Sequence, residues 1–290
     1  MESPRRDQTS EGVGQLLAAP FTPAQAARAG IGRAELERRQ REGRIIRLVR
    51  GVYLDAQTPL SRAVRAEALA LVVGRRQILV DRTAAWIHGA EPVRVRSGDP
   101  LPVDLHSTRR RLGTVIRLEA GDVVPVEGLR CTSALRTALD LSRHLPAEEA
   151  LPLLDGMLRA GSLAHPDLIR ASVRWTRLTG TAQVRELAAM ADGRAYGAAE
   201  SVLRLRWYEA RLPTPTPAVV VSGHRLALGL ATHRFGVVLG RFAADALTDT
   251  ARAGWRVLVL DPVRVRTSDP EVVIGHLERE FHQHLLTQVG

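Results

Sequence analysis

Arginine is the residue type whose number and spacing point most directly to a chemistry. The chain has 290 residues, and its 41 basic residues are all arginine because the sequence contains no lysine. We favour a genome-wide composition bias as the cause of this use of arginine alone, and a need for planar phosphate-binding donors is the alternative. Either cause gives the protein an affinity for polyanions. Guanidinium groups grip phosphate through paired N–H donors. With a formal net charge of +10, the sequence predicts a polyanionic partner, and nucleic acid is the commonest one in a cell.

Carboxylates are the second group, because a Mg²⁺-dependent nuclease needs two or more of them to converge on the metal. Glu200 stands near the start of an expected helix, and Asp245 and Asp249 lie on a later one, yet the segment 210–244 contains no Asp or Glu. Two interpretations stay open. Glu200 with Asp245 or Asp249 forms a displaced metal site of a DNA endonuclease, or there is no catalysis and no metal. We favour the second, with Glu200 as a surface charge or a charge stabilised at a helix N-terminus.

His88, His106 and Cys131 are the other candidates for catalysis or metal binding. Neither histidine has a carboxylate at useful spacing, and Cys131 has no adjacent His and no second Cys. We therefore expect structural roles for all three, with Cys131 buried in a strand. The sequence implies no cofactor. A single cysteine, no apolar leader and no run of about 18 apolar residues predict a cytoplasmic protein without a membrane partner.

The elements that must position the arginines come first in the chain. After a disordered start at 1–12, Thr22, Pro23 and Gln25 have the spacing of a capping box with Pro in the first turn. A second helix is expected from Arg33 to Gly43, followed by a tight hairpin in RIIRLVRGVYLDA. These elements predict a helix-turn-helix with a wing, and a solvated helical face is the alternative. The expected DNA contacts are Arg33, Arg38, Arg39, Arg41, Arg44, Arg47, Arg50 and Tyr53.

The stretch FTPAQAARAGIGRAELERRQREGRIIRLVRGVYL resembles the N-terminal winged helix of the AbiEi-type antitoxins. AAWIHG and CTSALRTALDL, further along, are also similar to segments of such proteins. The resemblance implies a DNA-binding repressor of the type IV toxin–antitoxin kind. Its partners would be double-stranded DNA and a cognate toxin protein, and a homodimer is left open. An interaction module that binds an acidic protein is a further alternative.

The rest of the chain is expected to alternate helices and short strands. Strands are predicted at 101–107 and 113–119, Ser133 is expected to cap a helix, and Asp81 another. The fold class is α/β (α+β), with a winged helix-turn-helix at 13–58, a mixed α/β middle domain at 59–192 and a C-terminal domain at 193–290. In the last, the predicted order is helix, three strands, helix, strand and helix, with TPTP as a stiff connector.

This C-terminal order, with AAESVLRLRWYEARLP and TDTARAGWRVLVLD, resembles the small Vsr-like endonuclease domains of the PD-(D/E)XK superfamily, which have a restriction-endonuclease-like fold. The resemblance places the helix glutamate at Glu200 and the remaining acids at Ala227, Val238 and Gly240, none of which is acidic. It therefore implies an inactive nuclease-like domain. A second basic patch, either a phosphate contact or a set of exposed loops, would comprise Arg109, Arg110, Arg111, Arg225, Arg234 and Arg241.

Overall fold

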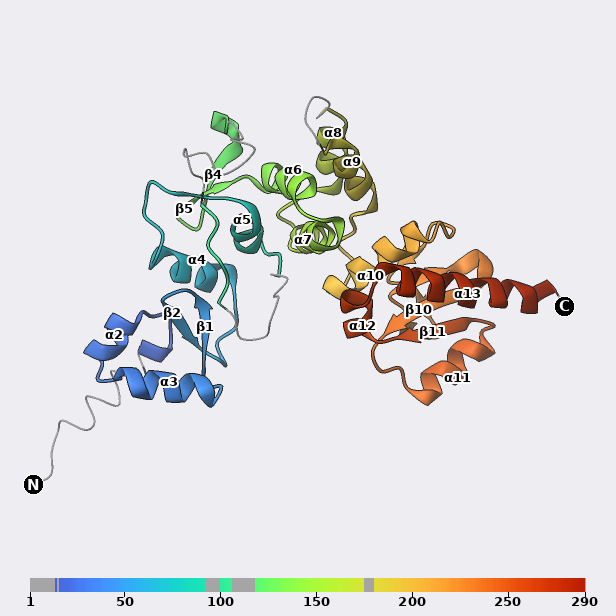
Figure 1. Cartoon of the computed structure of the whole chain (residues 1–290), viewed down its shortest axis with the longest axis horizontal. Coiled ribbons are helices and arrows are strands. Elements are labelled where there is room, and N and C mark those ends of the chain that lie inside the picture. The colour runs from blue at the N-terminus through green and yellow to red at the C-terminus, as the bar shows by residue number, and fades with distance from the viewer. Residues whose placement is uncertain (1–13, 15, 92–99, 106–117, 175–179, 290) are drawn as a thin grey trace, which may run out of the picture. The chain divides into compact units, whose positions relative to one another are not determined.

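The computed structural model describes residue 14 and residues 16–91, 100–105, 118–174 and 180–289 (Figure 1). The chain forms two compact units, Met1–Thr137 (unit 1) and Ala138–Gly290 (unit 2). Both contain helices and small sheets, which confirms the mixed α/β class. The division into three domains at 58 and 192 stays a prediction. In the described part of the chain, no helix is both long and apolar enough to cross a membrane.

Unit 1 begins with two short helices whose ends follow from local sequence. In α2 (Pro23–Arg28), the Gln25 N–H donates to Thr22 Oγ1 over 3.3 Å, and the Thr22 N–H donates to Gln25 Oε1 over 2.8 Å. This confirms the capping box, with Pro23 in the first turn. Helix α3 (Arg33–Arg41) follows after Gly30, whose φ of +84° favours glycine.

The hairpin that follows has two apolar faces. Strands β1 (Ile45–Val49) and β2 (Val52–Asp55) are antiparallel, and Gly51 in the turn has a φ of +84°. Ile45 packs with the helices in a small core, and Tyr53 packs against that core from the same face. That core is formed by Phe21, Ala26, Ile31, Leu36 and Ile45. Phe21 and Tyr53 also exchange two backbone hydrogen bonds of 2.9 and 2.8 Å, which adds a third chain segment to the hairpin, consistent with a winged helix.

The opposite face of the hairpin packs against the rest of unit 1. Leu48, Val49, Val52 and Leu54 are buried in one core with residues of the later helices and strands. Those elements are α4 (Arg62–Ala70), β3 (Ile78–Leu79), α5 (Asp81–Ile87), a short 3₁₀ helix η1 (Ala120–Asp122), β4 (Val123–Val126) and β5 (Leu129–Thr132). Their sheet has the order β3-β5-β4, with β3 parallel and β4 antiparallel to β5. The wing and the following residues thus share one core.

Unit 2 joins a helical part to a small mixed sheet. Helix α6 (Ala134–His144) crosses the boundary between the units and begins with the Arg136 N–H donating to Ser133 Oγ, as predicted. The other helices are α7 (Ala147–Arg159), α8 (His165–Arg174), α9 (Thr181–Met190), α10 (Ala198–Glu209), α11 (Ala244–Arg252), α12 (Pro262–Thr267) and α13 (Pro270–Val289).

The sheet of unit 2 has the order β11-β10-β9-β6. Its strands are β6 (Thr216–Pro217), β9 (Leu228–Leu230), β10 (Phe235–Leu239) and β11 (Arg256–Leu260), and a 3₁₀ turn, η2 (Ala231–His233), links β9 to β10. Only the β10–β11 pair is parallel. A separate ribbon is formed by β7 (Val220–Val221) and β8 (His224–Arg225). A small mixed sheet flanked by helices was predicted, but the predicted order of elements was wrong in two places: five strands, β6 to β10, lie between α10 and α11 where three were expected, and α12 precedes the last helix.

Several local expectations were wrong. Of the predicted strand at 101–107, the described residues 101–105 form only isolated bridges, from Leu101 to Val49 and from Leu105 to Leu79, and Pro102 between them has no N–H with which to continue a ladder. Residues 106 and 107 lie outside the described part of the chain. Asp81 is the first residue of α5 and not its cap. The TPTP connector contributes the edge strand β6. The predicted strand at 113–119 lies mostly outside the described residues, and β4 and α12 were not predicted.

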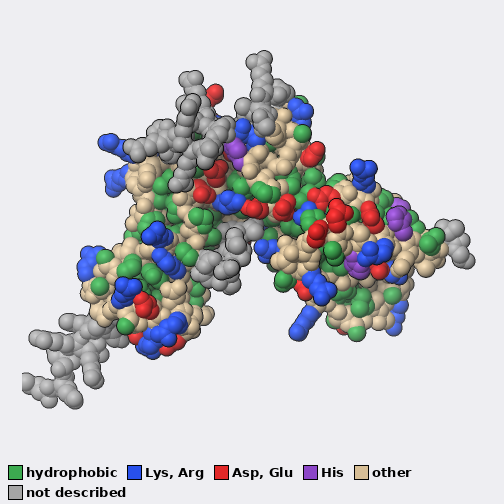
Figure 2. Space-filling view, viewed as in Figure 1, with side chains coloured by type: hydrophobic (Ala, Val, Ile, Leu, Met, Phe, Trp, Pro, Cys, Tyr) green, Lys and Arg blue, Asp and Glu red, His purple; other side chains and the backbone are tan. Residues whose placement is uncertain are grey.

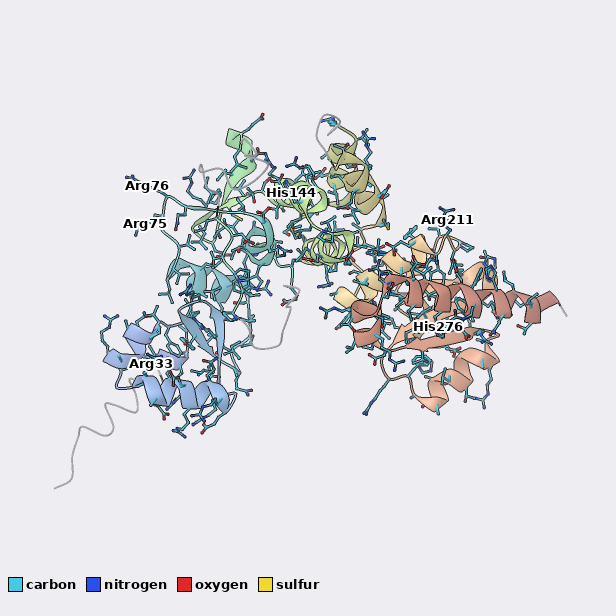
Figure 3. All side chains as sticks on the ribbon, in the orientation of Figure 1. Arg33, Arg75, Arg76, His144, Arg211 and His276 are labelled. Atoms are coloured by element: carbon cyan, nitrogen blue, oxygen red, sulfur yellow. The ribbon has the colours of Figure 1, made fainter. Side chains whose placement is uncertain are left out.

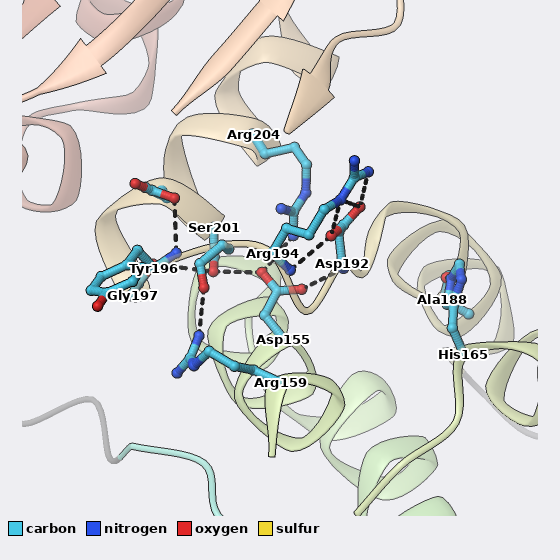
Figure 4. Close-up of polar contacts among 12 residues, drawn as sticks. Asp155, Arg159, His165, Ala188, Asp192, Arg194, Tyr196, Gly197, Ser201 and Arg204 are labelled. Atoms are coloured by element: carbon cyan, nitrogen blue, oxygen red, sulfur yellow. Dashed lines mark hydrogen bonds and ion pairs between the residues drawn. The ribbon is translucent and has the colours of Figure 1, made fainter. Parts of the chain in front are cut away.

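A buried ion pair links α7 to α10 in the middle of unit 2 (Figure 4). The Asp155 side chain is 1% exposed and that of Arg204 2%, and they are joined by a 2.5 Å contact. Asp155 also accepts hydrogen bonds from the Ser201 hydroxyl and the Asp192 N–H. Burial raises the pKa of Asp155, while Arg204, Ser201 and Asp192 oppose this. The helix around the pair is buried on all sides from Ser201 to Trp207.

Asp155→Asn should therefore lower the free energy of unfolding of the protein by about 3 kcal/mol, because the Arg204 guanidinium is left buried without its counter-charge. Asp167→Asn is the matched control, since it breaks an exposed pair with Arg170 and should cost less than about 1 kcal/mol. Urea unfolding followed by circular dichroism measures both. Equal losses in the two variants would show that the buried pair has no special role.

Candidate nucleic-acid interface

Helix α3 presents most of its surface to solvent. Leu36 is its one buried residue, and it is the residue through which the helix packs on the small core. Arg33, Arg38 and Arg41 are exposed and Arg39 is half-buried; Figure 3 labels Arg33 at this end of unit 1. A helix held by one side chain leaves its other faces free for a groove or a partner. Basic side chains gather on the surface at this end of unit 1 (Figure 2), which fits a DNA-binding helix and a solvated helical face alike, so the contacts with DNA stay a prediction.

Most of the α3 arginines are already paired with glutamates of the same segment. Glu35 contacts Arg38 and Arg39, each over 2.6 Å. Glu37 pairs with Arg33 over 2.9 Å, and Glu42 with Arg38 and Arg44. Hydrogen bonds from Arg39 and Arg38 lower the pKa of Glu35. The positive charge of this helix was predicted from the sequence, but these pairs were not, although glutamate and arginine stand at i,i+3 and i,i+4 spacing in it.

Three of the predicted contact residues have no acidic partner among the residues that the structure describes: Arg41, Arg47 and Arg50. Arg50 is exposed in the turn of the hairpin. Arg47 faces Tyr53 across the strands, so its side chain lies on the face of the hairpin that adjoins the helices. Its Nε is buried and has no acceptor in the described structure. The exposed guanidinium groups of Arg41 and Arg50 are open to an external anion, whereas Arg47 is half-buried and its Nε is closed to one.

Tyr53 differs from the arginines in its surroundings. Its ring stacks on that of Phe21, with centroids 6.1 Å apart and planes 25° apart, and it packs against the small core. This contact gives Tyr53 a structural role in packing the hairpin on the small core, and its contact with DNA stays a prediction. A sequence pattern could not separate the two roles, because aromatic residues in a hairpin serve both.

The structure places His88 beside Cys131, a contact that sequence spacing did not show. His88 Nε2 lies 2.7 Å from the Thr132 carbonyl oxygen and 3.6 Å from Cys131 Sγ. Nε2 therefore donates to the carbonyl and cannot accept the thiol proton. Burial lowers the pKa of His88 and raises that of Cys131 to about 12. Both residues are buried, as expected for structural roles; His106 and Arg109–Arg111 lie outside the described residues.

Glu200 is held in a structural ion pair. Its carboxylate receives two hydrogen bonds from Arg225, of 2.6 and 2.8 Å, and one from the Tyr196 N–H. The Glu200 side chain is 13% exposed. Arg225 also lies over the Tyr196 ring, 5.5 Å from its centroid. The positive charge predicted for Arg225 is thus neutralised, whereas Arg234 and Arg241 are exposed.

The displaced acids do not converge with Glu200. Asp249 pairs with His224 over 3.3 Å, and His224 precedes Arg225 in β8. Because successive side chains of a strand point to opposite faces, the partners of His224 and Arg225 lie on different sides of the ribbon. Asp245 is exposed in the first turn of α11. In the part of the chain that is described, no three His, Cys, Asp or Glu residues are grouped so that they could hold a metal.

The positions where the nuclease resemblance implied acids are structural. Ala227 is 3% exposed in the main core of unit 2, and Val238 is 3% exposed in a second cluster with Val221 and Leu226. Gly240 has a φ of +82°, a conformation that favours glycine. Ala227 and Val238 therefore face different sets of side chains, and this geometry gives no support to a converging acid site.

Comparison with known proteins supports the N-terminal resemblance only. Residues 19–54 match the family model described as "Transcriptional regulator, AbiEi antitoxin", whereas nothing in the comparisons supports the Vsr-like resemblance. No solved structure matches the chain. Two Mycobacterium tuberculosis proteins, "Uncharacterized protein MT2308" of strain CDC 1551 / Oshkosh and "Uncharacterized protein Rv2248" of strain H37Rv, are each 30% identical over 196 residues. The match covers 66% of this chain and 70% of each relative. The chain therefore belongs to the family of these two mycobacterial proteins, with an AbiEi-like regulator segment at its N-terminal end.

Proposed function

We propose that the protein is a DNA-binding transcriptional regulator of the antitoxin kind, which contacts double-stranded DNA with α3 and the β1–β2 wing. The observation that carries the proposal is the position of Arg47 and Arg50, which lie without acidic partners on the hairpin next to an exposed arginine-rich helix. The match of residues 19–54 to the regulator family supports it. A cognate toxin protein and a second copy of the chain are the further partners that this class of protein suggests.

The arginines of α3 that are paired with glutamates bind phosphate only after the glutamate is displaced, unlike Arg41, Arg47 and Arg50. Exposed pairs at i,i+3 and i,i+4 spacing are worth only about 0.3–0.5 kcal/mol each. A phosphate can therefore displace a glutamate from Arg38 or Arg39 at little cost. Until it does, Glu35 and Glu42 repel phosphate and hold the guanidinium groups in place. Arg41, Arg47 and Arg50 supply the initial attraction, and the glutamates limit binding to DNA whose shape brings phosphates close to α3.

Arg47→Gln with Arg50→Gln should weaken binding to DNA from upstream of the protein's own gene. The slope of log K against log salt should fall by about two, because each lost phosphate contact removes about 0.9 from it. Fluorescence anisotropy at several salt concentrations measures the slope. Arg33→Gln with Arg38→Gln is the control with the same change in net charge, and it should lower the slope less, since both residues are paired. Absence of salt-dependent binding by the unsubstituted protein would refute the proposed function itself.

Glu35→Gln should strengthen binding to DNA of unrelated sequence by several-fold at low salt, because it releases Arg38 and Arg39 and removes a charge that repels phosphate. The helix should lose roughly 0.5 kcal/mol of stability. Gel shifts with a specific and an unrelated duplex measure both affinities. The ratio of the affinity for the specific duplex to that for the unrelated duplex should decrease. Glu67→Gln is the control, because Glu67 is an exposed glutamate of α4 that has no arginine partner among the described residues. A weaker affinity for the unrelated duplex would contradict the role given to Glu35.

The proposal includes no catalysis by unit 2, since Glu200 is engaged by Arg225 and the displaced acids lie elsewhere. Plasmid DNA incubated with the purified protein and Mg²⁺ or Mn²⁺ should remain intact. Nicking or linearisation that disappears in Glu200→Ala would overturn this part of the proposal. A gel that resolves supercoiled from nicked plasmid is sufficient, and Glu209→Ala, at the other end of α10, controls for the loss of one carboxylate.

A further inference from the structure

A tight turn in unit 1 presents two adjacent arginines to solvent. The Gln77 N–H donates to the Gly74 carbonyl over 2.9 Å, which makes 74–77 a β-turn with Arg75 and Arg76 at its two central positions. The Gln77 side chain closes the turn from the other direction, since its Oε1 accepts from the Gly74 N–H over 2.6 Å. Arg75 and Arg76 are both exposed, and Figure 3 labels them at the surface of unit 1.

A third arginine fixes this turn to the neighbouring strand. Arg130 Nη1 donates to the Arg76 carbonyl over 3.1 Å. Arg130 lies in β5 next to buried Cys131, so its side chain stands on the opposite, exposed face of the sheet. Within the described residues, none of the three guanidinium groups pairs with an acid. Three like charges without compensation repel one another, and a bound anion would relieve this.

The turn and the wing belong to one compact unit. Strand β3 follows the turn directly, and Leu79 of that strand is buried in the same core as Val49 and Val52 of the wing. A duplex long enough to reach both α3 and the turn would need no rearrangement between them, because they share this compact unit, so the second contact costs little conformational entropy. We infer that Arg75, Arg76 and Arg130 form a second phosphate-binding surface, which contacts duplex DNA outside the segment held by α3 and the wing. This inference rests on the proposed function.

The surroundings of the turn favour a nucleic acid over a protein partner. The centre of a protein interface is apolar and poor in charge. In the described part of unit 1, Val72 is the only large apolar side chain that is exposed, at 40%. The turn itself offers two guanidinium groups, a glycine and an amide. A surface of this composition matches phosphate oxygens, which need charge and N–H donors but no apolar contact.

Arg75→Gln with Arg76→Gln tests the inference on two duplexes with the same central sequence, one of about 15 and one of about 40 base pairs. On the long duplex, the variant should bind at least several-fold more weakly than the unsubstituted protein, with the salt slope lower by about two. On the short duplex, the two proteins should bind equally. Arg75→Lys with Arg76→Lys should retain most of the affinity, because it keeps the charge.

Arg264→Gln with Arg266→Gln is the matched control, since both residues are exposed on α12 of unit 2 and the change in net charge is the same. Unchanged affinity and slope of the Arg75 and Arg76 variant on the long duplex would overturn the inference, as would an equal loss on both duplexes. The proposed function is tested separately, because it fails only if the unsubstituted protein does not bind either duplex. Thermal unfolding should show the same midpoint for all variants, since the substituted positions are exposed.

Discussion

The burial of the β1–β2 hairpin on both faces is the constraint on which unit 1 depends. One face closes the small core with α2 and α3, and the other closes the larger core with α4, α5 and β5. Side chains that alternate in direction along a strand make this possible. The hairpin therefore packs against a core on each of its two faces. Only its turn, with Arg50, is exposed to solvent. The hairpin thus shares one core with the sheet that carries Arg130.

Unit 2 depends on a polar interaction in the same way. The Asp155–Arg204 pair lies where α7 meets α10, and α10 is buried from Ser201 to Trp207. Burial of two charges is expensive, and the pair is tolerated because Ser201 and the Asp192 N–H complete the carboxylate's hydrogen bonds. Apolar contacts alone would allow α10 to rotate or slide, whereas a charge pair has one satisfactory position. The Glu200–Arg225 pair is a second ion pair of α10 and lies at the start of this helix.

Local signals in the sequence were sufficient to predict α2, α3 and the β1–β2 hairpin, whereas contacts between residues far apart in the chain could not be predicted from it. Thr22 with Gln25 defined a helix start, and the Arg50–Gly51 pair defined a hairpin, because each depends on neighbouring residues. Glu200 and Arg225 are 25 positions apart and Asp155 and Arg204 are 49 apart, so only the fold brings them together. The same holds for His88 and Cys131. Strand β4 was missed because Pro125 lies inside it, and a proline normally argues against a strand.

The burial of Cys131 makes the protein suitable for site-specific labelling through an introduced cysteine. It is fully buried, and burial raises its pKa to about 12, so the thiolate that reacts with maleimides is essentially absent at neutral pH. Since it is the only cysteine in the chain, we expect the folded protein to react very little with a thiol-directed label. A fluorophore or spin label attached to a cysteine introduced on the surface of either unit would report on that position alone, and pairs of such labels would measure the distance between the two units in solution.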